Sequence, residues 1–315
     1  MQFLRFLLLA SLASIAIDAR AGCGSAFCSL NTNWSTQGAW TERGGRFDLR
    51  YEFIDQDQPR AGTSDVDVGE IPRHHDEVRT INRNIIAGFD YTFDQNWGIG
   101  VQLPVVDRNH EHIHNHMGDQ ELESWSFTEL GDVRVVGRYR FTSEHTHAGG
   151  FGVQFGVKLP TGKIDVANDV GEEAERSLQP GSGTTDAILG AFYSAPLGQS
   201  ATWFADVNWQ VPLNERDDYK PGNRASFDIG AGYPWTGTVT LQLQLNTLWK
   251  DRDAGANAEP EDTGGTFVYL SPGVSVSLGQ KTQLYGFVQL PLYQNVNGVQ
   301  LTADWSVAAG LSHRF

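Results

Sequence analysis

Apolar and polar side chains alternate along almost the whole chain, and this period of two constrains the fold more than any other feature. In "FGVQFGVKL", residues 151 to 159, every second residue is apolar and the residues between are small or polar. The pattern recurs in "FDLRYEF" (47 to 53), "WGIGVQL" (97 to 103) and "TVTLQLQLNTLW" (238 to 249). Successive side chains of a β-strand point to opposite faces, so the pattern predicts strands with one apolar and one polar face.

The alternation predicts twelve strands, and the connections between them also alternate in length. The predicted strands span 45–54, 78–93, 96–106, 132–142, 149–159, 184–194, 201–212, 225–233, 237–249, 265–277, 281–291 and 301–315. Short turns alternate with long polar segments at 55–77, 107–131, 160–183, 213–224, 250–264 and 292–300. Short connections at one end and long ones at the other are typical of up-and-down outer-membrane barrels, in which the long loops are extracellular.

The first residues predict export. "MQFLR" carries a positive charge, "FLLLASLASIAI" is apolar, and Ala19, Arg20 and Ala21 provide a small-residue cleavage site. We therefore expect residues 1–21 to be a signal peptide that is cleaved after Ala21. The apolar run is shorter than the roughly 20 residues that a membrane-spanning helix needs, and no later run of the sequence is long enough either.

An exported chain that meets lipid without apolar helices must close its sheet, because only a closed sheet pairs every backbone donor and acceptor in hydrocarbon. The predicted fold class is therefore all-β: a transmembrane up-and-down antiparallel β-barrel over residues 45–315, in the outer membrane and in contact with its lipid. Residues 22–44 are expected to form a periplasmic N-terminal segment. The alternative is a secreted β-sandwich, whose apolar faces would pack against each other.

Several short stretches of the second half resemble a known family. They are "LGDVRVVGRYRF" (130–141), "GVKLPTGK" (156–163), "GSGTTDAILGAFYS" (181–194) and the final Phe315. Together they resemble the outer-membrane transporters named after the MetA pathway of phenol degradation, over residues 130–315. The resemblance implies an outer-membrane barrel that moves small molecules. A terminal aromatic residue also implies recognition of the last strand by the outer-membrane assembly machinery.

The polar face of the early strands is charged, and we expect it to line the lumen. The predicted lumen-lining residues are Arg46, Asp48, Arg50, Glu52, Arg134, Arg138 and Arg140. Charges of both signs can pair across the lumen and stiffen a narrow barrel. Rows of arginine can instead orient a polar or anionic solute. Twelve strands leave a modest lumen, so the predicted function is a channel or transporter for a small solute.

The stretch "RNHEHIHNHM" falls in the predicted outer segment 107–131 and suggests a metal site. Its histidines alternate, and two more histidines lie in the neighbouring outer segment; the candidate ligands are His110, His112, His114, His116, His74 and His75. Imidazole nitrogens with nearby carboxylates suit zinc or copper, and no other cofactor is expected. A His-rich loop can also be only a polar surface. The alternative function is a non-conducting surface barrel that captures a transition metal.

The cysteines, the net charge and the position of His313 further limit the functions that this chain can have. Cys23 and Cys28 are the only cysteines, and in an oxidising compartment we expect them to form a disulfide, although a metal-binding or redox pair is the alternative. The net charge of −15 argues against a nucleic-acid partner. We predict no enzyme, because His313 is the only histidine in a predicted strand and no serine or acid is spaced to act with it.

Overall fold

The computed structural model describes residues 22–23, 26–71, 76–116, 119–141 and 150–315. No helix in this part of the chain is long and apolar enough to cross a membrane. The strands are β1 (Gly22–Cys23), β2 (Gly44–Gln56), β3 (Gln58–Ala61), β4 (Ser64–Asp65), β5 (Asp76–Thr92), β6 (Trp97–His116), β7 (Asp119–Leu130), β8 (Arg134–Phe141), β9 (Gly150–Lys158), β10 (Asp186–Leu197), β11 (Ala201–Pro212), β12 (Arg224–Pro234), β13 (Val239–Lys250), β14 (Gly265–Leu278), β15 (Thr282–Val296), β16 (Val299–Thr302) and β17 (Ser306–Arg314).

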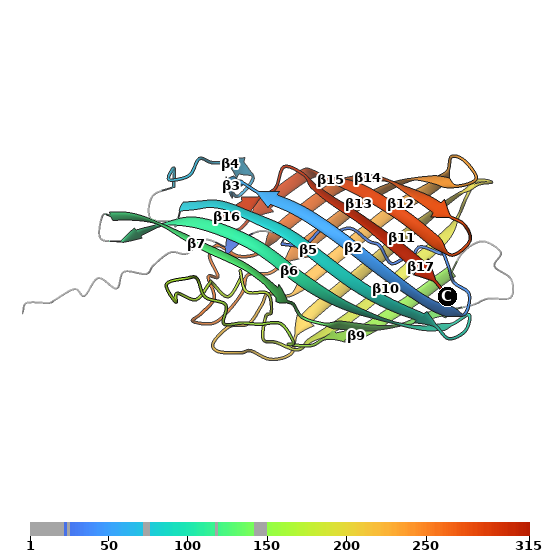
Figure 1. Cartoon of the computed structure of the whole chain (residues 1–315), viewed down its shortest axis with the longest axis horizontal. Coiled ribbons are helices and arrows are strands. Elements are labelled where there is room, and N and C mark those ends of the chain that lie inside the picture. Colours follow the sequence, from blue (N-terminus) through green and yellow to red (C-terminus); the bar gives the residue numbers. More distant parts are fainter. Residues whose placement is uncertain (1–21, 24–25, 72–75, 117–118, 142–149) are drawn as a thin grey trace, which may run out of the picture.

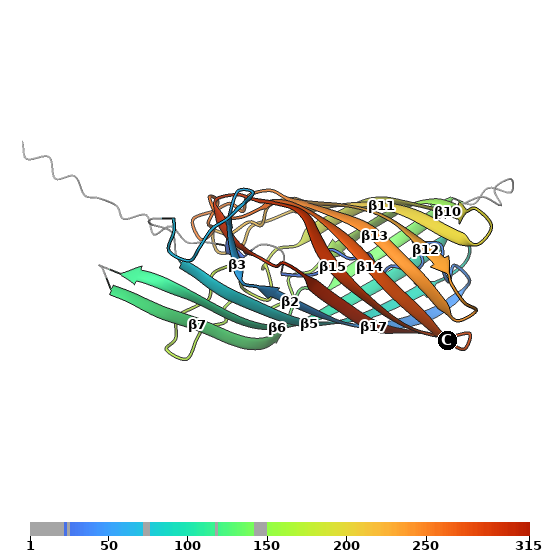
Figure 2. The ribbon, with the colours of Figure 1, turned by 90° about the horizontal axis from the view of Figure 1, so that it is seen from above.

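Twelve of these strands form a closed antiparallel barrel (Figures 1 and 2). They are β2, β5, β6, β8 to β15 and β17. Each pairs with its neighbours in the sequence, and the last strand, β17, pairs with the first, β2, which closes the sheet. The remaining short strands β1, β3, β4 and β16 form a second small sheet at the end of the barrel that carries the long connections, which we call the outer end.

The predicted fold is confirmed, because each of the twelve predicted strands corresponds to one strand of the wall. The prediction was wrong for residues 107–131, which were expected to be a polar loop. In the structure β6 continues to His116, and β7 returns beside it from Asp119. This hairpin extends past the rest of the wall at the outer end (Figure 1). It continues into the wall strand β8, which pairs with the inner half of β6.

The apolar face of the wall is its outer surface. On β2 the side chains of Phe47, Leu49 and Tyr51 are more than 40% exposed, whereas the alternate residues Arg50 and Glu52 are buried inside the barrel. An apolar belt on the outside of a closed sheet is the lipid-facing surface of an outer-membrane barrel. Water-soluble proteins rarely expose a continuous apolar belt of this kind.

A charge placed on this surface tests its contact with lipid. Leu243 lies outward near the middle of β13 and is 50% exposed. We expect Leu243→Arg to lower the free energy of unfolding in lipid vesicles by about 2–4 kcal/mol, the cost of an arginine at the bilayer midplane. The matched control is Leu278→Arg, at the last residue of β14. It should cost only about 0–1 kcal/mol because it lies near the interface. Equal costs at the two positions would contradict the assignment of the belt.

The N-terminal segment lies inside the barrel, and its expected periplasmic location (residues 22–44) was wrong for the described part. The Asn31 backbone N–H donates to Gln244 Oε1 (3.3 Å), and the Asn31 carbonyl accepts from Gln244 Nε2 (2.9 Å). Farther along, the indole of Trp34 donates to Ser312 Oγ (3.2 Å). These partners belong to two different strands of the wall, β13 and β17. The segment therefore runs through the lumen, from β1, which pairs with β16 at the outer end, to β2.

Apolar contacts hold this segment against one side of the lumen. Cys28, Leu30 and Trp34 form a buried cluster with Ile54, Tyr285, Phe287 and Ala308 of the wall. The predicted Cys23–Cys28 disulfide is not formed, because Cys28 is a buried free thiol that donates to Ser306 Oγ (3.5 Å). The side chain of Cys23 lies outside the described part of the structure. Cys28 therefore acts as a small packing residue, for which a buried free cysteine is well suited.

Candidate functional site

A cavity of about 470 Å³ lies in the lumen between the N-terminal segment and the wall. Its charged lining residues are Arg46, Asp48, Arg50, Asp90, Arg108, Asp132, Arg134, Arg138, Lys158, Arg176, Asp186, Asp206, Arg224, Asp228 and Lys250. Nine of these are basic and six are acidic, although the whole chain has a net charge of −15. The fold therefore concentrates positive charge in the lumen of an acidic protein.

Several of the cations are already neutralised by partners in the wall. Arg138 donates to Asp90 Oδ1 (2.9 Å) and to Thr92 Oγ1 (2.6 Å). Arg50 lies 3.0 Å from Glu52 Oε1, a carboxylate that is fully buried. Such pairs stiffen the wall and offset the cost of removing charges from bulk water. They leave these cations little free capacity to bind a solute.

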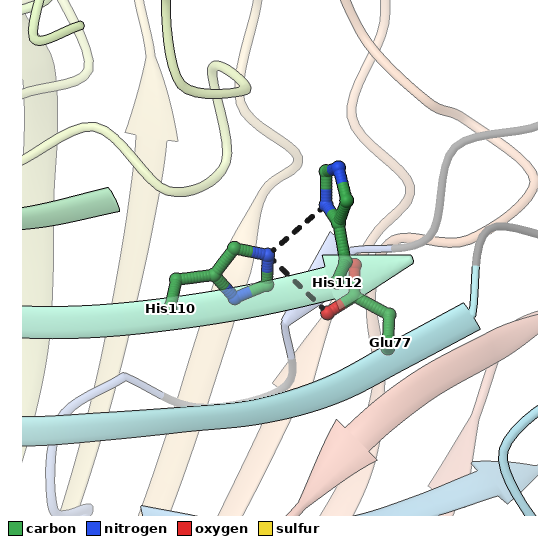
Figure 3. A group of neighbouring side chains, drawn as sticks. All are labelled: Glu77, His110 and His112. Carbon is green, nitrogen blue, oxygen red and sulfur yellow. Dashed lines mark hydrogen bonds and ion pairs between the residues drawn. The ribbon is translucent and has the colours of Figure 1, made fainter. Parts of the chain in front are cut away.

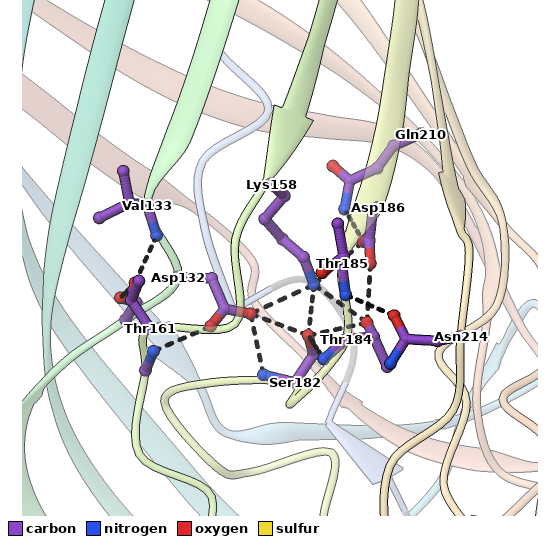
Figure 4. A network of polar contacts seen from close by, with 12 residues as sticks. Asp132, Val133, Lys158, Thr161, Ser182, Thr184, Thr185, Asp186, Gln210 and Asn214 are labelled. Atoms are coloured by element: carbon purple, nitrogen blue, oxygen red, sulfur yellow. Dashed lines mark hydrogen bonds and ion pairs between the residues drawn. The ribbon is translucent and has the colours of Figure 1, made fainter.

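Lys158 and Asp132 form a denser network at the outer rim of the cavity (Figure 4). The Lys158 ammonium lies 3.2 Å from Asp132 Oδ2 and 3.0 Å from Asp186 Oδ2. Asp132 also accepts from the backbone N–H groups of Gly162 (3.0 Å) and Ser182 (2.9 Å). Both of those residues belong to the long connection between β9 and β10. One carboxylate thus fixes both ends of an outer loop to the wall.

Close packing of two glycines allows this arrangement. A Cβ atom on Gly181 would lie 2.5 Å from the carbonyl carbon of Gly162, which is closer than any normal contact. These glycines belong to "GVKLPTGK" and "GSGTTDAILGAFYS", the stretches that carry the family resemblance. The shared motifs therefore build the folded loop at the mouth of the lumen.

Removing the Asp132 charge tests this role. Asp132→Asn should lower the free energy of unfolding by about 1.5–3 kcal/mol, the usual contribution of a hydrogen bond to a charged group, because Lys158 loses one of its two carboxylates. Urea unfolding of the refolded barrel measures the change. Asp165→Asn is the matched control, since Asp165 is exposed on the same loop. An equal effect of the two substitutions would argue against the role of Asp132.

Outer loops cover the cavity above this rim. Tyr219, from the connection between β11 and β12, is buried and donates to Asp253 Oδ2 (2.9 Å). Burial raises the pKa of the Tyr219 phenol well above its usual value, and the nearby Asp253 carboxylate adds to this shift. The phenol therefore stays a neutral donor. The Arg176 guanidinium lies over the Tyr219 ring, 5.0 Å from its centroid, which joins the two loops by a cation–π contact.

Two arginines in the cavity differ from the others. Arg134 and Arg224 are the first residues of β8 and β12 and both line the cavity. Among the described residues, neither guanidinium has a hydrogen-bond or ion-pair partner within reach, and the two groups repel each other electrostatically. The carboxylates of Asp186 and Asp132 favour the charged form of Arg134 from a longer range, and the charge of Arg50 opposes it. A negatively charged group between these arginines would relieve the repulsion and accept their hydrogen bonds.

The structure places the predicted lumen residues as follows. Arg46, Asp48, Arg50, Arg134 and Arg138 line the cavity. Glu52 is buried beside Arg50, and Arg140 donates to the Ser35 carbonyl of the N-terminal segment (2.6 Å). Sequence reasoning missed Arg224. Arg224 alternates with Ser226 and Asp228 along β12, and all three face the lumen, so the alternation of inward and outward residues would have identified it.

Only some of the predicted metal ligands come together. His110 and His112 lie beside Glu77, and His112 and His114 lie beside Glu123. His74, His75 and the side chain of His116 lie outside the described residues. The clustered histidines are on the β6–β7 hairpin and not on an irregular loop.

Comparisons with known proteins agree with this architecture. A family model described as "Putative MetA-pathway of phenol degradation" matches residues 86–302. The outer membrane channel from Pseudomonas putida F1 is 12% identical with a TM-score of 0.64, covering 87% of this chain and 96% of that chain. The NanC porin is 10% identical with a TM-score of 0.49 (85% and 100% covered). The Ralstonia pickettii toluene transporter TbuX is 10% identical with a TM-score of 0.44 (87% and 90% covered).

No functionally curated protein matches the sequence. At an identity of 12%, the likeness to the Pseudomonas structure concerns the fold, which is that of an outer-membrane barrel. The predicted location in the outer membrane is thereby confirmed.

Proposed function

This chain belongs to the family of the MetA pathway of phenol degradation, and we propose that it is an outer-membrane channel for small aromatic anions. One observation carries the preference for anions: Arg134 and Arg224 face the lumen cavity, and among the described residues neither guanidinium has a hydrogen bond or a close ion pair. The excess of basic over acidic lining residues points in the same direction. Fixed positive charge along a pore attracts anions and repels cations.

The solute class rests on two further points. The family description refers to phenol degradation, so small aromatic compounds are the first class to test. The structure from Pseudomonas putida F1 is described as an outer membrane channel. A cavity of about 470 Å³ is within the usual size range of sites for small organic molecules.

Uptake of two permanently charged aromatic ions into proteoliposomes tests the proposal. Benzenesulfonate and phenyltrimethylammonium are of similar size and cannot cross a bilayer by losing their charge. We expect benzenesulfonate to enter at least about tenfold faster, which corresponds to a difference of about 1.4 kcal/mol. Protein-free vesicles provide the background, and heat-modifiable gel mobility confirms that the barrel is folded. Equal or faster entry of the cation would contradict anion selectivity.

A non-conducting barrel is the second candidate, and the N-terminal segment inside the lumen favours it. The segment occupies space that a solute would need, and buried hydrogen bonds hold it to β13 and β17. A folded barrel that admits neither ion would support this candidate and exclude the channel.

A further inference from the structure

A buried group of polar side chains lies where β5 pairs with the outer part of β6 (Figure 3), and none of them lines the lumen cavity. Glu77 comes from β5, and His110 and His112 come from β6. The three residues are at most 2% exposed. Trp125 of β7 packs against both imidazoles, with ring centroids 5.8 Å from His110 and 4.9 Å from His112. Burying ionisable groups is costly unless they are paired or bind a metal.

A β-bulge in β5 brings the carboxylate to this face. Glu77 pairs with His112 and Thr80 pairs with His110, and the register shifts between Glu77 and Arg79. In a regular strand, residues three apart point to opposite faces. The extra residue of the bulge turns both Glu77 and Thr80 inward, toward the two histidines. Bulges commonly re-aim a side chain next to a functional site.

The atoms of this group have the spacing of metal ligands. His110 Nε2 lies 3.3 Å from His112 Nδ1 and 3.6 Å from Glu77 Oε2. The candidate ligand atoms of the three residues all lie within 4.8 Å of one another. In a tetrahedral zinc site with bonds of about 2.0–2.1 Å, neighbouring ligand atoms are about 3.3–3.4 Å apart. These two distances therefore need little adjustment for the three residues to surround one ion.

Hydrogen bonds orient both imidazoles for this role. His110 Nδ1 lies 2.7 Å from Thr80 Oγ1, and His112 Nε2 lies 2.9 Å from Glu123 Oε2. If these two nitrogens carry the protons, the remaining nitrogens, His110 Nε2 and His112 Nδ1, present lone pairs toward Glu77. A carboxylate or hydroxyl behind a ligating histidine is the usual support of metal sites, because it fixes the tautomer and the ring orientation.

The Glu77 carboxylate gives an independent indication that this group binds a cation. It is fully buried, and neither of its oxygens has a hydrogen-bond partner among the described residues. The nearby acids Glu259 and Asp262 interact with it unfavourably. We propose that Glu77, His110 and His112 bind a first-row transition metal ion, Zn²⁺ in the first instance, with a fourth position left for water. Two imidazoles and one carboxylate are a ligand set that Zn²⁺ accepts.

The neighbouring residues offer a route for the ion. His114 and Glu123, whose side chains are 24% and 18% exposed, lie 3.3 Å apart next to His112. These two more exposed side chains can bind the ion first and pass it inward to the neighbouring His112. Binding would tie β5 to the β6–β7 hairpin at the outer end of the barrel. The site is separate from the lumen cavity, so it does not depend on the proposed channel function.

Zinc competition against a chromogenic chelator tests the proposal, using the full mature chain refolded in detergent without a polyhistidine tag. We expect one tightly held zinc ion per barrel. Glu77→Gln keeps the size of the side chain and removes the ligand charge. The zinc affinity of this variant should fall by more than roughly 10–100-fold, which is the loss typically seen when a residue that only supports a metal ligand is removed. His110→Ala combined with His112→Ala should abolish the tight site. Co²⁺ should give the absorption of a four-coordinate ion in the native chain and not in this double variant.

His114→Ala is the matched control, because His114 lies on the same strand two residues beyond His112. We expect it to slow zinc uptake and to change the equilibrium affinity little. Heat-modifiable mobility establishes that every variant is folded. The proposal is overturned if the native chain binds zinc no more tightly than the His110→Ala, His112→Ala variant. It is also overturned if His114→Ala abolishes binding while Glu77→Gln does not, since the exposed group would then be the site.

Discussion

Replacing Arg134 and Arg224 by glutamate is expected to reverse the charge preference of uptake, so that phenyltrimethylammonium enters faster than benzenesulfonate. Both arginines face the cavity, and among the described residues neither guanidinium has a hydrogen bond or a close ion pair, so their N–H groups can bind a passing anion. Each charge-assisted hydrogen bond contributes about 1.5–3 kcal/mol. Losing even one should lower benzenesulfonate uptake at least about tenfold, and the new carboxylates should attract the cation.

A second double variant separates this local effect from a change in total charge. Arg43→Glu with Arg216→Glu makes the same change in net charge, but neither residue lines the cavity. This variant should keep the native preference for benzenesulfonate. If both double variants shift uptake equally, the surface charge and not the lumen sets selectivity. If neither shifts it, the two arginines do not line the path of the solute.

Trp34→Ala is expected to produce the largest loss of stability of any single change in the N-terminal segment. Trp34 is 2% exposed, meets Tyr285 edge to face with centroids 5.2 Å apart, and donates to Ser312. Replacing a buried tryptophan by alanine usually costs about 3–5 kcal/mol. Urea unfolding of the refolded barrel measures this loss. Conductance should rise as well, because the released segment no longer fills its part of the lumen.

Trp235→Ala is the control for this change. Trp235 lies in a short turn after β12 and is 66% exposed, so its removal leaves no internal cavity. We expect little change in conductance and a smaller loss of stability. If Trp34→Ala destabilises the barrel no more than Trp235→Ala, the segment is not packed in the lumen as described.

The wall of the barrel could be predicted from the sequence because apolar side chains face the lipid and polar side chains face the lumen at alternate residues. The strand predicted at 201–212 begins and ends at the same residues as β11, Ala201–Pro212. The inward position of Arg50 and Arg134 followed from the same alternation. Arg224 obeys it too, and it was missed only because it precedes the predicted start of its strand.

The β6–β7 hairpin could not be predicted in this way. It extends beyond the apolar belt, where the outer face no longer needs hydrophobic side chains. Glu111 is exposed, while its neighbours His110 and His112 are buried, so both faces of the strand are polar. Without hydrophobic alternation, a strand there has the same sequence pattern as a polar loop.

Two other features depend on contacts between distant residues. Glu77 faces His110 only because a bulge shifts the register of β5, and no local pattern in the sequence marks that bulge. The N-terminal segment lacks a period of two, and its place is set by partners such as Gln244, more than 200 residues away. A polar lumen offers such a segment the hydrogen bonds that its buried backbone requires, which composition alone cannot reveal.

The most direct measurement is the reversal potential of the native protein in a planar bilayer under a KCl gradient. A positively charged lumen predicts channels whose reversal potential has the sign of chloride selectivity. A cation-selective reversal potential, or a membrane that stays silent although the inserted barrel is folded, would contradict the account.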